Sequence, residues 1–384
     1  MAEAADAGIR IPLAEVELDE REVEAVSAVL RSRWLTAGAT CARFEEALRG
    51  LCGVTHALAV SNCTAALHLA YLALGVGPGD EVLVPSLSFV ASANMARAVG
   101  ATPVFCDSLG ADDFNVDPAD LARRVTPRTR AIAVVHFGGY PCALDEILRL
   151  GRERGIPVIE DCAHAPGGTL GGRPLGSLGD VGCFSFFGNK NITTGEGGAV
   201  TTNRPELGER LRLLRSHGMT TMTWDRHRGH AASYDVVLAG LNYRLDELRA
   251  AIGLVQLGRL ADNNARRARV VAAYRAALAE VPGLVVPFRD RTESTFHILP
   301  VLLPAGADRA AVMTRLRAAG IQTSIHYPPT HQFTAYRSSS PQLPVVEALA
   351  PRILTLPLYP RMTDAEVGLV ADELAAALGT RSPL

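Results

Sequence analysis

The sequence predicts an α/β fold, with a large domain built on a mostly parallel, seven-stranded sheet and a smaller α+β domain after it. Three observations indicate this architecture. Short apolar runs alternate with segments of helical period through the first part of the chain. A long helical tract rich in Ala, Arg and Leu follows, and shorter mixed elements come after it. The 384 residues also exceed the roughly 150 residues of an average domain.

Seven short apolar runs are the predicted strands of the large domain. Helices are expected between them, for example at Thr64–Leu74 and at Leu144–Arg154, which ends at Gly155 ahead of Pro157. Strands joined by such helical crossovers are parallel and buried on both faces. The predicted strands are His56–Val60, Glu81–Val84, Pro103–Cys106, Ala131–Val135, Pro157–Glu160, Cys183–Phe186 and Gly198–Thr201.

The change to a second domain is expected inside the helical tract Leu245–Ala279, which is broken at Pro282-Gly283. We therefore assign residues 1–255, with an N-terminal arm, to the large domain and residues 256–384 to the small one. Two strands and two helices are predicted beyond the tract. In chain order they are Ser294–Leu303 as a strand, Arg309–Ala319 as a helix, Gln322–His326 as a strand and Asp364–Leu378 as a helix.

The composition narrows the classes of function. Hydrophobic residues make up 48% and charged residues 20%, as in soluble globular proteins. A net charge of -2 provides no field that favours nucleic acid or an anionic membrane. The N-terminus has no apolar signal segment and no stretch reaches about 18 apolar residues, so a cytoplasmic protein is expected. The seven cysteines show no Cys-x-x-Cys spacing and are expected to be mostly buried thiols.

The most informative segment is Phe184–Gly198, in which a predicted strand leads into a loop with one lysine and a glycine-rich end. Lys190 is the only lysine in the chain. Schiff-base chemistry needs an amine that can lose its proton, and Arg cannot supply one. A solvated loop lysine is the alternative interpretation. The uniqueness of Lys190 and its neighbourhood favour the chemical role.

An acid is predicted at the edge of the sheet where open α/β folds bind ligands. Asp161 directly follows the predicted strand Pro157–Glu160, and His164 lies in the next turn. An aspartate there can pair with a protonated pyridine nitrogen and keep a cofactor ring an electron sink. The alternatives are that Asp161 caps the turn and that His164 is a satisfied, partly buried histidine.

Three further features suit a phosphorylated ring. The backbone N–H groups of Thr64 and Ala65 open a helix after a strand and can bind a phosphate. The hydroxyl of Ser185 is another phosphate candidate. Phe89 leaves the end of a strand and can stack on a ring. The alternatives are that Thr64 is only the N-cap of its helix, that Ser185 has no role beyond its place in the strand, and that Phe89 belongs to the core.

Five segments, in this order, resemble the DegT/DnrJ/EryC1/StrS aminotransferases. These are pyridoxal-phosphate (PLP) dependent sugar and aminocyclitol aminotransferases of the aspartate-aminotransferase fold, PLP fold type I. The likeness runs almost end to end, from Pro12 to Pro360. The matching segments are Asn62-Cys-Thr-Ala-Ala-Leu, Pro85-Ser-Leu-Ser-Phe, Glu160-Asp-Cys-Ala-His, Phe184-Ser-Phe with Lys190-Asn-Ile-Thr-Thr-Gly-Glu-Gly-Gly, and Asn242-Tyr-Arg-Leu-Asp-Glu.

The resemblance implies a role for each residue around the ring. It makes Lys190 the catalytic residue that binds PLP as a Schiff base, and Asp161 the partner of the pyridine nitrogen. It places His164 near the ring hydroxyl and Phe89 on the ring face. Lys190 would also move the proton of the substrate, and it must be a neutral amine to do so.

The resemblance also implies how the phosphate is bound. Thr64, Ala65 and Ser185 would bind it in one subunit, and Asn242 would reach the phosphate of the other subunit's cofactor. A homodimer with shared active sites is therefore expected. The clearest departure from the family is Cys63, where glycine is usual, so the phosphate loop is expected to differ slightly.

The reaction implied by the resemblance has two halves. An amino donor, glutamate or glutamine, leaves pyridoxamine phosphate, which then aminates a keto-sugar or a keto-cyclitol. The flank Phe187-Gly188-Asn189 is similar to a branch that includes perosamine synthases, which aminate a nucleotide-linked keto-hexose. This favours a keto-hexose acceptor, in secondary-metabolite (antibiotic) or cell-surface sugar biosynthesis.

Two segments are expected to contact the substrate. Met219–Tyr234 is dense in cations and hydrogen-bond donors, although a surface loop is the alternative. By resemblance, the second segment lies beside the cofactor, and His326, Tyr327 and His331 are its substrate-side candidates. Two histidines five apart around Pro-Pro are poor zinc ligands, so no metal is expected.

Two other functions remain as alternatives. A dehydratase of the same family removes a sugar hydroxyl, but a histidine replaces the lysine in that branch, and Lys190 argues against it. Its iron–sulfur version also needs additional cysteines, and none follows Cys183. A regulatory homologue without chemistry predicts loss of the lysine or the acid, and both are present.

Overall fold

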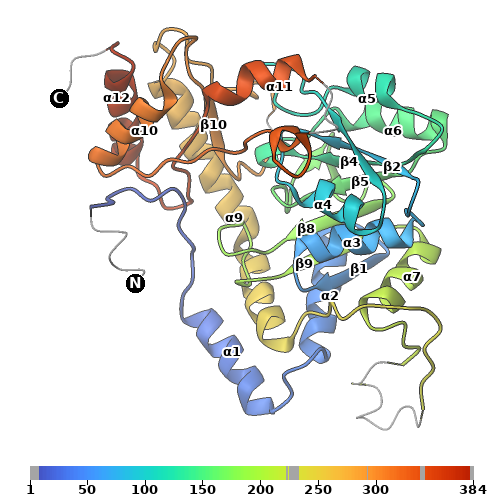
Figure 1. Ribbon diagram of the computed structural model, residues 1–384. Coiled ribbons are helices and arrows are strands. Elements are labelled where there is room, and N and C mark those ends of the chain that lie inside the picture. The colour runs from blue at the N-terminus through green and yellow to red at the C-terminus, as the bar shows by residue number, and fades with distance from the viewer. Residues whose placement is uncertain (1–7, 222–223, 225–232, 292, 338–341, 381–384) are drawn as a thin grey trace.

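The computed structural model describes residues 8–221, 224, 233–291, 293–337 and 342–380, and it has the predicted α/β fold (Figure 1). Its large sheet has the strand order β1-β9-β8-β5-β4-β2-β3. Neighbours from β8 to β3 are parallel, whereas β9 runs antiparallel to β1 and to β8. The seven predicted runs form these seven strands: β1 (His56–Val60), β2 (Glu81–Pro85), β3 (Thr102–Cys106), β4 (Thr129–Val135), β5 (Val158–Asp161), β8 (Val181–Ser185) and β9 (Gly198–Thr202).

Helices cover both faces of the sheet, which explains why its strands are apolar throughout. Along β4, Ala131 and Ala133 face one apolar cluster, while Ile132 and Val134 face the other. The first face is covered by α3 (Cys63–Ala73), α4 (Ala91–Ala98) and α7 (Pro205–Arg215). The second is covered by α2 (Ala39–Cys52), α5 (Pro118–Arg124) and α6 (Leu144–Arg154).

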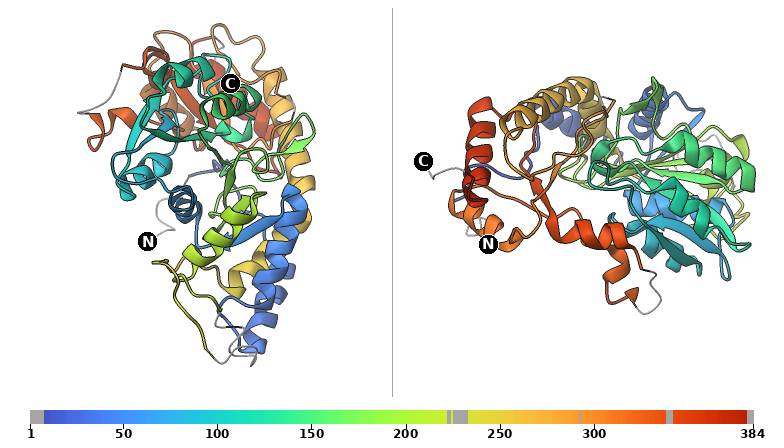
Figure 2. Two further views of the ribbon diagram at one scale, coloured as in Figure 1. Left: turned by 90° about the vertical axis from the view of Figure 1, so that its right-hand side faces the viewer. Right: turned by 90° about the horizontal axis from the view of Figure 1, so that it is seen from above.

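A long helix, α9 (Glu247–Ala277), connects the sheet to the C-terminal elements (Figure 1). It packs against α1 (Glu20–Ser32) and α2 and also against α12 (Asp364–Ala377). From above, α12 lies on one side of α9 and the sheet on the other (Figure 2). The boundary predicted after residue 255 falls inside α9, and the division into two domains stays a prediction.

The C-terminal part is a small α+β unit. Its β10 (Leu299–Leu302) pairs antiparallel with β11 (Ile353–Leu356). The N-terminal arm reaches this part, because Ile11 bridges to Ile321. The remaining elements are α10 (Arg309–Ala318), α11 (Pro344–Leu349), the two-residue strands β6 (Thr169–Leu170) and β7 (Arg173–Pro174), and the 3-10 turns η1 (Phe137–Gly139), η2 (Thr330–Gln332) and η4 (Ala350–Arg352).

Two predicted strands are wrong in whole or in part. Only Leu299–Leu302 of Ser294–Leu303 is a strand, because Thr295 and His297 donate their N–H groups to the carbonyls of Gly139 and Gly138 instead of to a ladder. Gln322–His326 is not a strand, and it makes one isolated bridge, from Ser324 to Thr355 of β11. The strand that pairs with β10 is β11, which was not predicted.

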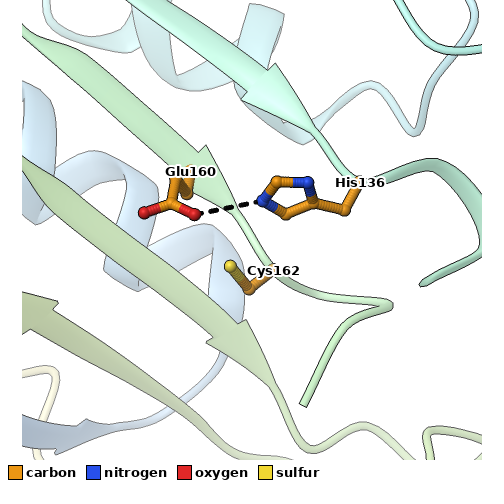
Figure 3. A group of neighbouring side chains, drawn as sticks. All are labelled: His136, Glu160 and Cys162. Carbon is orange, nitrogen blue, oxygen red and sulfur yellow. Dashed lines mark hydrogen bonds and ion pairs between the residues drawn. The ribbon is translucent and has the colours of Figure 1, made fainter. Parts of the chain in front are cut away.

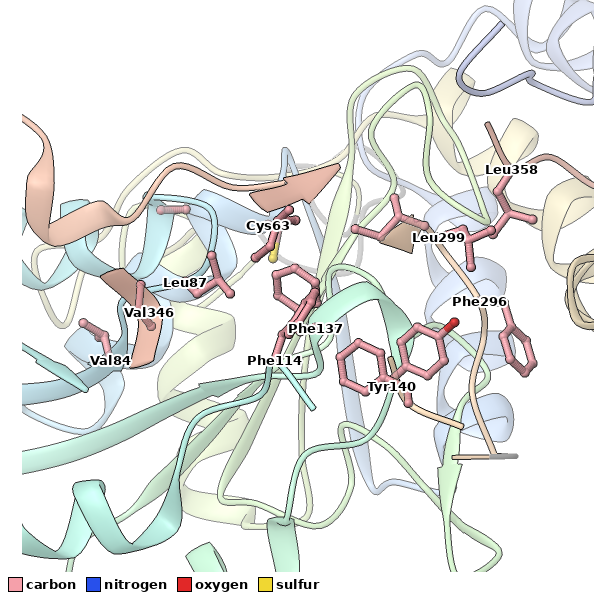
Figure 4. Packing of buried hydrophobic residues seen from close by; sticks show 14 of the residues in the cluster. Cys63, Val84, Leu87, Phe114, Phe137, Tyr140, Phe296, Leu299, Val346 and Leu358 are labelled. Atoms are coloured by element: carbon pink, nitrogen blue, oxygen red, sulfur yellow. The ribbon is translucent and has the colours of Figure 1, made fainter. Parts of the chain in front are cut away.

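One apolar cluster joins the two parts of the molecule (Figure 4). It includes the start of α3 and the ends of β2 as well as residues of the C-terminal part, so the edge of the sheet is packed against that part. All seven cysteines are free and buried, as expected. None of the helices in the described residues is long and apolar enough to cross a membrane. The labelled members of the cluster are Cys63, Val84, Leu87, Phe114, Phe137, Tyr140, Phe296, Leu299, Val346 and Leu358.

Candidate active site

The predicted site residues gather at the carboxyl edge of the sheet. Asp161 is the last residue of β5, and Ser185 is the last residue of β8. Lys190 lies in the loop from β8 to β9, in a turn where its N–H donates to the carbonyl of Phe187. Parallel strands deliver these side chains to the same edge, which is where open α/β sheets bind ligands.

Asp161 is a buried acid, with an exposed fraction of 6%. Its Oδ1 atom accepts the N–H of Ala163 at 3.0 Å and lies 3.7 Å from the Cys63 thiol. Its Oδ2 atom lies 3.5 Å from the Ser92 hydroxyl. Burial raises the pKa of Asp161, and this outweighs the opposing hydrogen bond from Ala163 and the charge of Lys190. Asp161 thus caps a turn, and because it accepts only one short hydrogen bond and two longer contacts, a protonated ring nitrogen would suit it.

Lys190 is partly buried beside this acid. Burial lowers its pKa to about 8, although the charges of Asp161 and Cys63 act in the opposite direction. Its Nζ atom lies 3.5 Å from Nε2 of His297. A lysine in these surroundings loses its proton far more readily than one in water, so the interpretation as a solvated loop lysine is not supported.

The loop after β1 is an N-terminal helix cap. Asn62 is the cap residue of α3, and its Oδ1 atom accepts the N–H of Ala65 at 2.8 Å. A phosphate bound at this turn would therefore share the N–H of Ala65 with Asn62 or displace the Asn62 side chain from it. Thr64 lies in the same first turn. Ser185 is 7% exposed, and its Oγ atom accepts the N–H of Phe187 at 3.4 Å. The phosphate site stays a prediction.

Phe89 lies at the rim of the site. It is 59% exposed, so the alternative that it belongs to the core is wrong. Its ring centroid lies 6.0 Å from that of Tyr327. An exposed aromatic ring next to buried polar groups is available to stack on a planar ligand.

His164 and Tyr327 form a hydrogen-bonded pair next to these residues. The N–H of Gly138 donates to His164 Nδ1 at 3.2 Å, so the proton of the neutral ring is on Nε2, which lies 2.9 Å from the Tyr327 hydroxyl. Burial lowers the pKa of His164 well below its usual value, and the charge of Lys190 lowers it further. The pair brings a predicted cofactor residue and a predicted substrate residue together.

The other two substrate candidates lie in different surroundings. His326 Nδ1 is 3.0 Å from Thr355 Oγ1, and burial lowers the pKa of His326 to about 4. His331 is buried, with Nδ1 2.5 Å from Ser86 Oγ and Nε2 3.3 Å from Glu347 Oε1. Both of its ring nitrogens have protein partners, so it fixes its loop to the segment after β2.

The segment of Asn242 lies beside the end of β1, where the N–H of Ser61 donates to the carbonyl of Tyr243 at 2.9 Å. Asn242 is exposed and bridges to Ser216. Most of the predicted substrate segment Met219–Tyr234 lies outside the described residues. Within it, Trp224 is described, and its ring centroid lies 4.7 Å from that of Trp34.

The structure places three further residues at the site that the sequence pattern did not indicate. His297 contacts Lys190, Ser92 contacts Asp161, and Asn191 contacts His297. The position of Asn191 next to the unique lysine was an available signal. His297 had none, because it lies in an apolar run that was predicted to be a strand.

A group of possible metal ligands lies directly behind the site: His136, Glu160 and Cys162 (Figure 3). Their ligand atoms lie within 4.8 Å of one another. However, Glu160 Oε1 accepts the N–H groups of Leu178 and Gly179, and Oε2 accepts those of Gly176 and His136. A carboxylate with four N–H donors has no free lone pair for an ion, so the group is a structural network.

Comparison with known proteins agrees with this geometry. Residues 16–375 match the model of the DegT/DnrJ/EryC1/StrS aminotransferase family. The spore coat polysaccharide biosynthesis protein SpsC of Bacillus subtilis (strain 168) is 39% identical over 360 residues, which are 91% of this chain and 92% of SpsC.

Two solved structures show the same fold. The aminotransferase TlmJ from Streptoalloteichus hindustanus is 38% identical with a TM-score of 0.90, over 97% of this chain and 99% of TlmJ. Spr1654 from Streptococcus pneumoniae, in its PLP form, is 30% identical with a TM-score of 0.89, over 96% of this chain and 98% of Spr1654.

The fold, the buried acid and the lysine with a lowered pKa define a PLP-dependent aminotransferase of fold type I. More particularly, the chain belongs to the DegT/DnrJ/EryC1/StrS aminotransferase family, whose members among its structural neighbours are sugar aminotransferases.

Proposed function

We propose that the protein transfers an amino group from glutamate or glutamine to a keto-sugar, with a nucleotide-linked keto-hexose favoured over a keto-cyclitol. The single observation that carries the proposal is Lys190, the only lysine of the chain, which lies beside the buried Asp161 with a pKa lowered to about 8. The similarity to SpsC supports a sugar acceptor and a place in cell-surface or secondary-metabolite sugar biosynthesis.

Bound PLP supplies the electron sink and carries the amino group between the two substrates. Lys190 would bind it covalently and, as a neutral amine, would move the substrate proton. Asp161 would hold the pyridine nitrogen in its protonated form, because a buried carboxylate gains from a cationic partner. Phe89 would lie against one face of the bound ring, and His164 near its hydroxyl.

The phosphate would be bound by Thr64, Ala65 and Ser185 of one subunit and by Asn242 of the other. Support for a homodimer comes from the exposure of Asn242 and from exposed apolar side chains in three places. Val23 and Leu30 lie on α1 and Leu35 follows it, Phe187 lies in the loop of Lys190, and Tyr234, Val236 and Val237 precede Asn242 in the chain.

On the substrate side, His326 and Tyr327 are the proposed contacts. Tyr327 is paired with His164 and lies near the exposed Phe89, so its segment borders the ring site. We propose an indirect role for His331, which holds that segment through Ser86 and Glu347.

The acceptor is tested by loading the purified protein with pyridoxamine phosphate and adding candidate ketones. Nucleotide-linked keto-hexoses are expected to restore the absorbance of lysine-bound PLP faster than keto-cyclitols do. A faster response to a keto-cyclitol would move the proposal to that class. No response to any ketone would contradict the proposed function.

A dehydratase or a regulatory homologue remains less well supported. The dehydratase branch has a histidine in place of the lysine, and a regulatory protein has no need of a lysine with a lowered pKa beside a buried acid. Release of keto acid when the PLP-loaded protein is given glutamate or glutamine, together with return of the absorbance of lysine-bound PLP in the ketone assay, separates amino transfer from these functions.

A further inference from the structure

His297 is a buried histidine that faces the catalytic lysine. Its exposed fraction is 6%, and its Nε2 atom lies 3.5 Å from Lys190 Nζ. That distance is at the long end of hydrogen bonding.

The tautomer of His297 is fixed by Asn191. The Nδ2 group of Asn191 donates to the carbonyl of Thr295 and to Asn264 Oδ1, both at 2.8 Å. These two acceptors orient the amide, so the Asn191 atom 2.9 Å from His297 Nδ1 is the Oδ1 acceptor. The ring therefore has its proton on Nδ1, and the lone pair of Nε2 points to Lys190.

The backbone around His297 is held on several sides. The N–H of His297 donates to the carbonyl of Gly138 at 2.9 Å, and Arg267 Nη1 donates to the carbonyl of His297 at 3.2 Å. The neighbouring Thr295 hydroxyl donates to the carbonyl of His164 at 2.6 Å. This segment was predicted as a strand, and its actual hydrogen bonds place the imidazole against Lys190 instead.

His297 stays neutral at ordinary pH. Burial lowers its pKa well below the usual value, and the positive charges of Lys190 and Arg267 lower it further. The His164 ring is a close neighbour, with centroids 4.5 Å apart. A neutral imidazole with this tautomer can only accept a hydrogen bond at Nε2, and a lysine ammonium can only donate.

We propose that His297 is a positioning residue for Lys190: its Nε2 atom accepts a hydrogen bond from the lysine amine, and Asn191 fixes the tautomer that makes this possible. The contact holds the amine in place whenever it is not bonded to the cofactor. Because one N–H of the neutral amine then points to His297, the single lone pair of Nζ points away from His297. The role in catalysis rests on the proposed function of Lys190, whereas the contact itself does not.

The unique lysine makes a direct test possible. In the full-length protein without PLP, the pH dependence of acetic anhydride labelling of the peptide that contains Lys190 gives the pKa of that amine by mass spectrometry. His297→Phe removes the acceptor and destabilises the ammonium, so the pKa of Lys190 should fall by about one unit. Labelling at pH 7 should then rise about five- to tenfold.

Three further variants separate the contact from packing. His297→Gln can offer an amide oxygen and should return the pKa of Lys190 to within about 0.3 unit of the wild-type value. Asn191→Leu frees the tautomer and should lower it by about half as much as His297→Phe. The control is His68→Phe, on α3, where the ring contacts Tyr243 and should leave Lys190 unchanged.

In the PLP-loaded enzyme, His297→Phe should lower kcat about tenfold and leave KM of the donor close to the wild-type value. The proposal is overturned if folded His297→Phe keeps the wild-type pKa of Lys190, or if His297→Gln shifts it as far as His297→Phe does. If His297→Phe does not fold, an unchanged pKa in Asn191→Leu overturns it. Failure here is distinct from failure of the proposed function, which borohydride trapping of PLP on Lys190 tests by itself.

Discussion

Glu160 and Asp161 are adjacent buried acids at the end of β5, and their surroundings are opposite. Four N–H donors satisfy Glu160. Although burial raises its pKa, the hydrogen bonds from His136 and the backbone outweigh burial and lower it overall. Asp161 accepts one backbone N–H and two longer contacts, and burial raises its pKa.

The difference separates an acid that stabilises the fold from an acid that is kept for a ligand. A fully satisfied carboxylate is costly to alter and has no bonding capacity left. An under-satisfied buried acid costs stability until a cation arrives, which is typical of functional sites. The successive residues of one strand point to opposite faces, so a single strand provides both.

Of the two acids, Asp161 should have the larger effect on catalysis when it is changed to Asn. An amide cannot hold the pyridine nitrogen protonated, so kcat should fall about 10²- to 10³-fold. The stability of the PLP-free protein should change by less than about 1 kcal/mol, because the substitution also removes a poorly solvated charge. Steady-state kinetics and urea unfolding measure the two quantities. A stable variant with wild-type kcat would contradict the role of Asp161.

Glu160→Gln should show the reverse pattern. The new NH₂ group faces N–H donors on one side of the carboxamide, which should cost about 2–4 kcal/mol of unfolding free energy. The kcat of the protein that remains folded should fall much less than in Asp161→Asn. If both variants lost activity and stability equally, the comparison between the two acids would fail.

The pH dependence of stability should have opposite signs for the two acids, although the effect is smaller. The pKa of Glu160 lies below its ordinary 4.5 in the folded protein, so its contribution to stability is lost as the pH falls through the folded pKa. The pKa of Asp161 lies above its ordinary 3.8, so its contribution is lost as the pH rises from there to the folded pKa.

Urea unfolding of the PLP-free protein between about pH 3 and about pH 7 measures both slopes. Glu160→Gln should remove part of the loss on the acid side, and Asp161→Asn should remove part of the loss as the pH rises. Slopes that both variants leave unchanged would show that neither acid has the shifted pKa assigned to it.

Much of the fold was predictable because its signal is local. Each strand of the large sheet is a short apolar run buried on both faces, so its position follows from neighbouring residues. The segment Ser294–Ile298 leads directly into the apolar run of β10, but its hydrogen bonds go to Gly138, Gly139 and His164, which lie far away in the sequence. Such contacts leave no periodic signal, and the strand was overextended.

The site residues, too, divide into those with a local sequence signal and those that depend on long-range contacts. Lys190 was found from its uniqueness, and Asp161 from its place at the end of a strand. His297 was missed because its role depends on Asn191 and Lys190, which are 106 and 107 residues away. His331 was predicted to face the substrate, and its burial between Ser86 and Glu347 depends equally on long-range packing.

The central claim is that Lys190 binds PLP, and the most direct test is borohydride reduction of the PLP-loaded protein followed by mass spectrometry of its peptides. The account predicts one reduced PLP adduct, on the peptide that contains Lys190, and none on any internal peptide of Lys190→Ala, which should still bind some PLP without a covalent bond. Because the chain has no second lysine, a covalent adduct on any peptide of Lys190→Ala other than the N-terminal one, whose α-amino group also reacts with PLP, would contradict it, as would an unmodified Lys190 in the reduced wild-type protein.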